Sequence, residues 1–152
     1  MSGENTGELV QYELTIPMLP DAELVAARAT EEIARLVAFA ERAVEQVRMA
    51  VIEACLNAIE HSGSADRRIY LTFVCDDEKL LIIVRDFGKG FDPLEVRQPD
   101  IREKLGAMDK GGWGLYLIRR LMDEVDFQQV STGTCLRMTK RRSPCAGVSA
   151  SS

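Results

Sequence analysis

The sequence predicts an α+β fold, a two-layer α/β sandwich in which a mostly antiparallel mixed sheet carries helices on one face. Apolar residues alternate at strand spacing in several short stretches and recur at helical spacing in longer ones. The strands cluster instead of alternating strictly with helices, which favours an α+β arrangement. With 152 residues, 46% of them hydrophobic, the chain is long enough for one domain with a substantial core.

The N-terminal part is predicted to be a strand followed by a helix. Residues 11–16 alternate polar and apolar, and Pro17 ends the strand. A helix is expected to open at Pro20-Asp21 and to break near residues 38–42. Its apolar face is expected to consist of Leu24, Val25, Ala27, Ile33, Leu36 and Val37.

The central helix is predicted over residues 47–62, and Gly63 is expected to end it in a left-handed conformation. Its apolar positions are Val47, Val51, Ala54, Cys55 and Ala58. Glu53 and Asn57 stand four residues apart and therefore share one polar strip of the helix. A carboxylate beside a carboxamide can activate a hydroxyl or a water and bind Mg²⁺. From this segment alone, a solvated polar strip is the simpler interpretation of the pair.

Two strands follow, at residues 68–75 and 79–85, joined by an acidic turn. The second is nearly continuous in apolar residues and is therefore expected at the centre of the sheet. Residues 86–112 contain many glycines and charges and are too many for an ordinary connection. We expect a functional loop or lid there, with a short helix at residues 100–108.

The C-terminal part is predicted to add a helix and a pair of strands. The expected ranges are 114–122 for the helix and 125–130 and 135–139 for the strands. The run Lys140-Arg141-Arg142 is interpreted as a solvated strand terminus. The folded domain is expected to span residues 9–142, between a disordered N-terminus (1–8) and a disordered tail (143–152).

Composition excludes several classes of function. The net charge of −5 without a basic stripe argues against direct nucleic-acid binding. No apolar run reaches the roughly 20 residues of a membrane span, and no signal peptide is recognised, so we expect a cytoplasmic protein without a membrane role. His61 is the single histidine, which excludes a His-rich metal centre. Buried reduced thiols are expected at Cys55, Cys75, Cys135 and Cys145.

Two glycine-containing segments can approach a ligand. Asp86-Phe87-Gly88-Lys89-Gly90 follows a buried strand, where the acid can accept a hydrogen bond from a ligand amine. Gly111-Gly112-Trp113-Gly114 precedes a helix, whose free amides and dipole favour phosphate. Taken singly, each segment is equally typical of a turn or a hinge. Neither is a Walker loop or a Rossmann fingerprint.

Taken together, these segments resemble the motifs of the GHKL (Bergerat-fold) ATPases, which include gyrase, Hsp90, MutL and histidine kinases. The N box corresponds to residues 53–61, the G1 box to residues 86–90 and the G2 box to residues 112–115. Gly133-Thr134 matches the last nucleotide-contacting element. The resemblance covers almost the whole folded part and implies the Bergerat fold, with ATP and Mg²⁺ as cofactors.

On the phosphate side, the resemblance implies that Glu53 is the general base and that Asn57 ligates Mg²⁺. Gly112 and Gly114 would place amides against the phosphates, and Leu115 completes that box. Lys110 would meet the γ-phosphate, at a position where the family more often carries arginine.

On the adenine side, the resemblance implies that Asp86 accepts a hydrogen bond from the adenine amine. Gly88 and Gly90 would shape this pocket, and Thr134 would support the base from the opposite side.

Within the superfamily, the N-box motif E-A-x-x-N-A-x-x-H is similar to that of the anti-sigma-factor serine/threonine kinases of bacterial partner-switching systems. That resemblance implies a kinase that phosphorylates a STAS-domain antagonist and sequesters a sigma factor or a similar regulator. A nucleotide-dependent binding module with little transfer and a slow ATPase related to histidine-kinase catalytic domains stay open as alternatives. A homodimer is equally left open.

Overall fold

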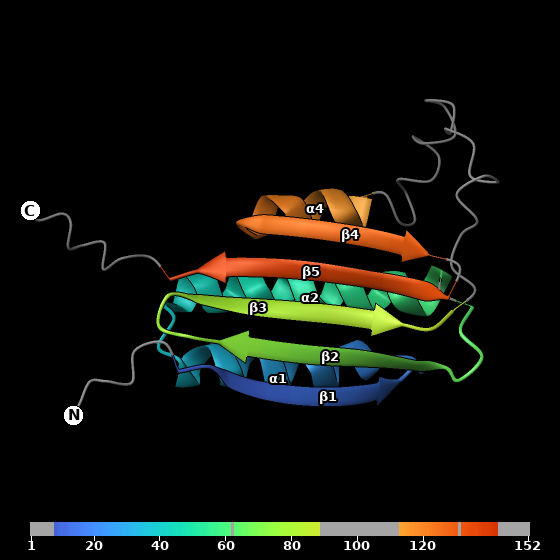
Figure 1. The fold of residues 1–152 in the computed structure, drawn as a ribbon, viewed down its shortest axis with the longest axis horizontal. Coiled ribbons are helices and arrows are strands. Elements are labelled where there is room, and N and C mark those ends of the chain that lie inside the picture. Colours follow the sequence, from blue (N-terminus) through green and yellow to red (C-terminus); the bar gives the residue numbers. More distant parts are fainter. Residues whose placement is uncertain (1–7, 62, 89–112, 131, 143–152) are drawn as a thin grey trace, which may run out of the picture.

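The computed structural model describes residues 8–61, 63–88, 113–130 and 132–142 and places them in two layers, a sheet and helices on one of its faces (Figure 1). The strands are β1 (Val10–Pro17), β2 (Arg68–Cys75), β3 (Lys79–Asp86), β4 (Glu124–Val130) and β5 (Gly133–Arg141). The helices are α1 (Ala22–Leu36), α2 (Glu41–His61) and α4 (Trp113–Leu121). Residues 1–7 and 143–152, Cys145 and the helix expected at 100–108 lie outside the described residues.

The sheet confirms the predicted α+β class. Its strand order is β1-β2-β3-β5-β4, and neighbouring described strands all pair antiparallel. β3 is the middle strand, as its apolar sequence predicts. Leu80, Ile82 and Val84 of β3 point into the core between the sheet and the helices, where they are buried. The described strands agree with the expected ranges to within two residues at each end.

The central helix starts earlier than predicted, because α2 already begins at Glu41. The predicted break between the first two helices lies just before α2, where Ala38 takes a left-handed conformation with φ of 65°. Gly63 has φ of 61°, which confirms the left-handed conformation expected beyond the helix end. The predicted apolar face is confirmed and extended, since the buried residues of α2 are Val44, Val47, Ala50, Val51, Ala54, Cys55 and Ala58.

The predicted apolar face of the first helix is wrong in part. Leu24, Val25 and Leu36 are exposed, Leu36 to 69%. The buried residues of α1 are instead Ala22, Ala26, Ala27, Thr30, Ile33 and Ala34. Small side chains allow a helix to lie close to its neighbours, so alanines rather than leucines form the contact face. The buried hydroxyl of Thr30 donates to the carbonyl of Ala26 over 2.7 Å and is thereby satisfied.

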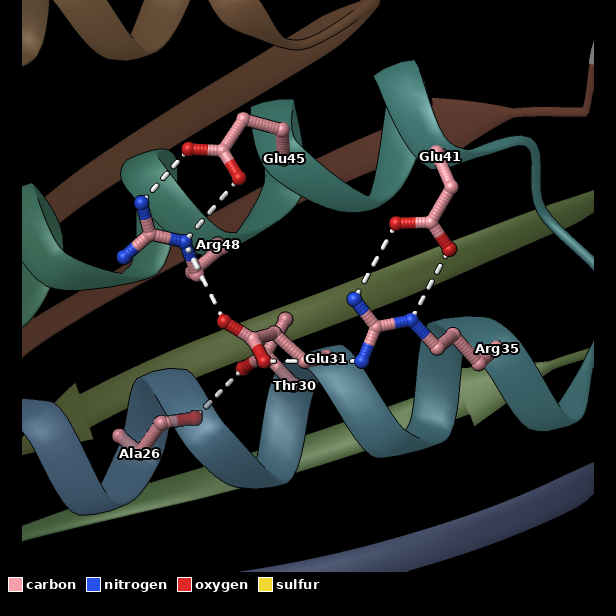
Figure 2. A network of polar contacts seen from close by, with 7 residues as sticks. All are labelled: Ala26, Thr30, Glu31, Arg35, Glu41, Glu45 and Arg48. Carbon is pink, nitrogen blue, oxygen red and sulfur yellow. Dashed lines mark hydrogen bonds and ion pairs between the residues drawn. The ribbon is translucent and has the colours of Figure 1, made fainter.

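A network of ion pairs crosses from α1 to α2 on the outer surface of the helix layer (Figure 2). Arg35 donates to both carboxylate oxygens of Glu41, over 3.0 and 3.1 Å. Arg48 bonds Glu45 on its own helix and reaches Glu31 on α1 at 3.3 Å. Exposed pairs contribute at most about 1 kcal/mol each. The network therefore aligns the two helices, while the apolar core holds them together.

Lys140 corrects the prediction of a solvated strand end. Its side chain lies on the inner side of β5, in alternation with the buried residues Leu136 and Met138, and Lys140 is only 9% exposed. Arg141 and Arg142 are exposed as expected.

The described cysteines agree in part with the prediction of buried thiols. Cys55 and Cys75 are buried free thiols, as expected, whereas Cys135 is partly exposed. Burial raises the pKa of the Cys55 thiol to about 12.

In the described part of the chain, no helix combines the length and the apolar character that crossing a membrane requires.

Candidate functional site

The predicted site residues that the structure describes gather at one end of the sandwich. α2 and β3 run towards this end, and α4 and β5 start from it, at the right in Figure 1. The antiparallel connection of the sheet therefore brings the end of one strand and the beginning of another to the same edge. Segments that lie far apart in the sequence meet there.

Glu53 and Asn57 lie against the beginning of α4. A Cβ atom added to Gly114 would stand 3.0 Å from the Glu53 Oε1 and 3.1 and 3.2 Å from the Asn57 Oδ1 and Nδ2. The backbone at Gly114 thus lies directly on both side chains, which are themselves half-buried. The strip is therefore covered by another helix instead of being simply solvated. It joins a carboxylate, a carboxamide and a helix N-terminus.

Asp86 is a buried carboxylate at the last position of β3, with an exposure of 4%. The backbone N–H of Gly88 donates to its Oδ1 over 3.0 Å, and the hydroxyl of Thr134 donates to its Oδ2 over 2.5 Å. Thr134 is the residue that pairs with Asp86 across the β3–β5 ladder. Each carboxylate oxygen keeps a second lone pair, so Asp86 can still accept a hydrogen bond from a ligand amine.

Gly133 makes this arrangement possible. Its φ is 146°, and an added Cβ would stand 2.1 Å from the carbonyl oxygen of Asp86. No other residue fits at this distance, so the start of β5 approaches β3 only because position 133 lacks a side chain. The close approach sets Thr134 within hydrogen-bonding reach of the Asp86 carboxylate.

An aromatic cluster beside Asp86 was not predicted from the sequence. Phe87 is 51% exposed, its ring meets Tyr70 edge-on at 5.3 Å, and the guanidinium of Arg85 lies 5.8 Å from its centroid. The Tyr70 hydroxyl in turn donates to Asp66 over 2.5 Å. Together with Ser64, whose hydrogen bond is the largest cause, this contact lowers the pKa of the Asp66 carboxyl. Only the β2–β3 register, which pairs Tyr70 with Arg85, could have revealed the cluster.

Three predicted site residues, Gly90, Lys110 and Gly112, lie outside the described residues. Leu115 is described and packs, partly buried, against the hydrophobic core. It contributes to the position of α4 through its side chain.

Among the described residues, no group of three or more His, Cys, Asp and Glu side chains is placed to hold a metal ion. Mg²⁺ is commonly bound through one or two protein ligands, with water and substrate phosphates supplying the rest. The amide oxygen of Asn57, adjacent to Gly114, fits that pattern and leaves the neighbouring Glu53 carboxylate free to act as a base. This arrangement therefore suits a Mg²⁺ ion whose other ligands are nucleotide phosphates and water, and not a metal ion ligated by protein side chains alone.

An antiparallel sheet covered on one face, with a buried acid at one strand end and an acid–amide pair under a glycine-led helix, defines the class of GHKL-type ATPases. Comparison with known proteins narrows this class. The family model described as "Histidine kinase-like ATPase domain" matches residues 16–140. The chain belongs to this family, whose members use ATP, and within it to the serine-protein kinases of the RsbW type.

Two relatives called "Serine-protein kinase RsbW" illustrate the similarity. The one from Bacillus pumilus is 31% identical over 137 residues, which cover 84% of this chain and 83% of the relative. The one from Listeria monocytogenes serovar 1/2a is 33% identical over 134 residues, which cover 84% of each chain.

Solved structures show the same fold. The RsbU and RsbW domains of a Mycobacterium tuberculosis protein superpose with a TM-score of 0.66 at 18% identity, over 88% of this chain and 32% of that one. The SiaB–SiaC complex of Pseudomonas aeruginosa gives a TM-score of 0.57 at 13% identity, over 84% of this chain and 88% of that one.

Proposed function

We propose that this protein is a Mg²⁺- and ATP-dependent serine/threonine kinase of a partner-switching system. It phosphorylates a STAS-domain antagonist and sequesters a sigma factor or a similar regulator. The observation that carries the proposal is the contact of Gly114 with Glu53 and Asn57. It supports the proposal because the candidate base and the candidate metal ligand lie against the helix terminus that is proposed to bind phosphate.

Each described side chain has a separate role in this proposal. Glu53 accepts the proton of the attacking serine hydroxyl, and a carboxylate on a covered helix surface suits that task. The amide oxygen of Asn57 would hold Mg²⁺, which would supply positive charge against the negative charge that develops on the phosphates during transfer. Asp86, oriented by Gly88 and Thr134, accepts a hydrogen bond from the adenine amine and fixes the base.

The residues outside the described part complete the proposed site. Gly90 shapes the adenine pocket, Gly112 joins Gly114 in placing amides at the phosphates, and Lys110 meets the γ-phosphate. A cation there complements the phosphate charge. Residues 9–142 are proposed to form the ATP-binding kinase domain.

The proposed partners follow from the family. The similarity to serine-protein kinases supports a protein substrate with an acceptor serine. The net charge of −5 argues against nucleic acid as the partner. We propose a cytoplasmic location, and self-association into a homodimer is to be tested by sedimentation.

The test is transfer of label from γ-labelled ATP to a co-encoded STAS protein. Glu53→Ala should lower transfer by a factor of about 10²–10⁴ while largely preserving ATP affinity, because a base acts in the transition state. Glu45→Ala is the matched control, since Glu45 lies on the same helix and, among the described residues, is hydrogen-bonded to Arg48 at the surface.

Three results would contradict the proposal. Tight ATP binding without transfer by the wild-type chain would leave a nucleotide-dependent binding module. Release of free phosphate alone would leave an ATPase. Equal transfer rates in the wild type and Glu53→Ala would remove the assignment of the base.

A further inference from the structure

Lys140 makes a contact that the proposed chemistry does not use. Its Nζ donates to the backbone carbonyl of Leu121, the last residue of α4, over 2.7 Å. Lys140 lies near the end of β5, on the side that faces the helices, and it is almost fully buried. The contact therefore ties the C-terminus of α4 to the sheet.

The contact suits a helix terminus in two ways. The last carbonyls of a helix have no partner within the helix, so a side-chain donor satisfies a group that would otherwise be orphaned. A cation also stabilises the negative end of the helix dipole. Burial lowers the pKa of Lys140, with Asp123 raising it and Arg42 lowering it to lesser extents. A strand lysine is thus held away from water at one specific carbonyl.

The other end of α4 carries the site. Gly114 lies seven residues before Leu121, a distance of about 10 Å along a helix. A helix this short moves as a unit, so a displacement at Leu121 is transmitted to Gly114 and to its contact with Glu53 and Asn57. β5 also carries Thr134, which bonds Asp86. One strand therefore contacts both the proposed adenine side and the helix of the proposed phosphate side.

We propose that Lys140 is a positioning residue for the phosphate side of the site: through Leu121 it sets the axial position of α4, and so the fit of Gly114 against Glu53 and Asn57. The proposal rests on the proposed function for its effect on nucleotide, but its effect on α4 is independent of any ligand. Adenine recognition at Asp86 does not depend on this contact.

The experiment compares Lys140→Met, which keeps the length of the side chain but not its donors, with Lys140→Arg, which keeps a cationic donor. Lys79→Met is the matched control. Lys79 sits on the adjacent strand β3 opposite Arg141, one step from the Leu80–Lys140 pair, and hence points to the other face of the sheet. Calorimetry measures ATP and adenosine affinity, and hydrogen exchange measures the α4 amides in ligand-free protein.

Lys140→Met should weaken ATP binding about tenfold, since small misplacements of binding groups are costly. Adenosine affinity should stay unchanged, and the α4 amides should exchange faster while those of β2 and β3 do not. Lys140→Arg should restore both properties, and Lys79→Met should resemble the wild type. If Lys140→Met does not fold, Lys140→Gln, which keeps a neutral donor, is compared with Lys140→Arg in the same assays.

Wild-type ATP affinity and wild-type α4 exchange in Lys140→Met would overturn the proposal. An equal loss of ATP and adenosine affinity would also overturn it, because it would show that Lys140 merely supports the fold. If the wild-type protein bound no adenine nucleotide, the proposed function would fail, and the exchange of the α4 amides would still decide whether Lys140 anchors this helix.

Discussion

Replacing Gly114 with alanine should separate stability from activity. Gly114 is the second residue of α4, and glycine in a helix is less stable than alanine by roughly 0.5–1 kcal/mol. The added Cβ would lie 3.0–3.2 Å from the ends of two side chains, Glu53 and Asn57. These ends can yield by a few tenths of an ångström. We therefore expect the free energy of unfolding to stay unchanged or to rise by up to about 1 kcal/mol.

Activity should respond in the opposite direction. The side chains that must yield are the proposed base and the proposed metal ligand. Catalytic groups must be held to within about 0.5 Å of their productive geometry, and misplacements on the ångström scale cost up to about 100-fold. Gly114→Ala should therefore lower the rate of single-turnover phosphotransfer by about 10- to 100-fold.

Urea unfolding and a quenched transfer assay measure the two effects on the same preparation. Gly63→Ala is the matched control. Gly63 has φ of 61°, a left-handed conformation that is unfavourable for alanine, and an added Cβ would meet nothing within 4 Å. The Gly63→Ala variant should therefore lose roughly 1 kcal/mol of stability and keep the wild-type transfer rate. Wild-type transfer by Gly114→Ala would refute the reasoning, as would a loss of stability beyond about 2 kcal/mol in that variant.

Three further predictions follow from the described contacts. In Asp86→Asn only one acceptor oxygen remains for the two hydrogen bonds that the Asp86 carboxylate accepts from Gly88 and Thr134. Calorimetry should therefore show weakened binding of both ATP and adenosine, and urea unfolding should show a stability loss of about 1–3 kcal/mol. Arg48→Ala removes two ion pairs of a partly exposed side chain, and the resulting stability loss of under about 1 kcal/mol should shrink when unfolding is repeated at high salt. Cys55 should resist alkylation of the native protein at mildly alkaline pH, as followed by mass spectrometry, whereas Cys135 should react. Because burial raises the Cys55 pKa to about 12, the unfolded thiol ionises first, and stability should fall as the pH rises from 9.0 towards 12.

Local pattern accounts for most of the secondary structure. The alternation of β2 and the apolar run of β3 follow from burial on one or both faces of a sheet, which is visible in neighbouring residues. The helical recurrence of α2 likewise follows from its own sequence. Where local pattern failed, packing decided: α1 turns its alanines inward and leaves Leu24 and Leu36 exposed, because a close helix contact needs small side chains.

The candidate site was predictable as a set of motifs and not as a geometry. Glu53, Asn57, Asp86 and Thr134 were all selected from the sequence through the resemblance of the combined segments to the GHKL motifs, since each segment taken singly is unspecific. Their distances were not available from sequence, because they depend on strand register and on how α4 lies on α2. The steric requirement at Gly133 could be recognised only from the approach of β5 to β3.

The sequence by itself thus determined the fold class, the order of the elements and the residue types of the site, because each depends on short-range periodicity and on motif chemistry. Tertiary structure alone decided which partners those residues meet. Lys140 illustrates the difference: its sequence context indicates a solvated strand end, but its place on the inner side of β5 puts its ammonium at the end of α4. Contacts between segments far apart in the chain leave no local trace, since they arise only when the layers close on one another.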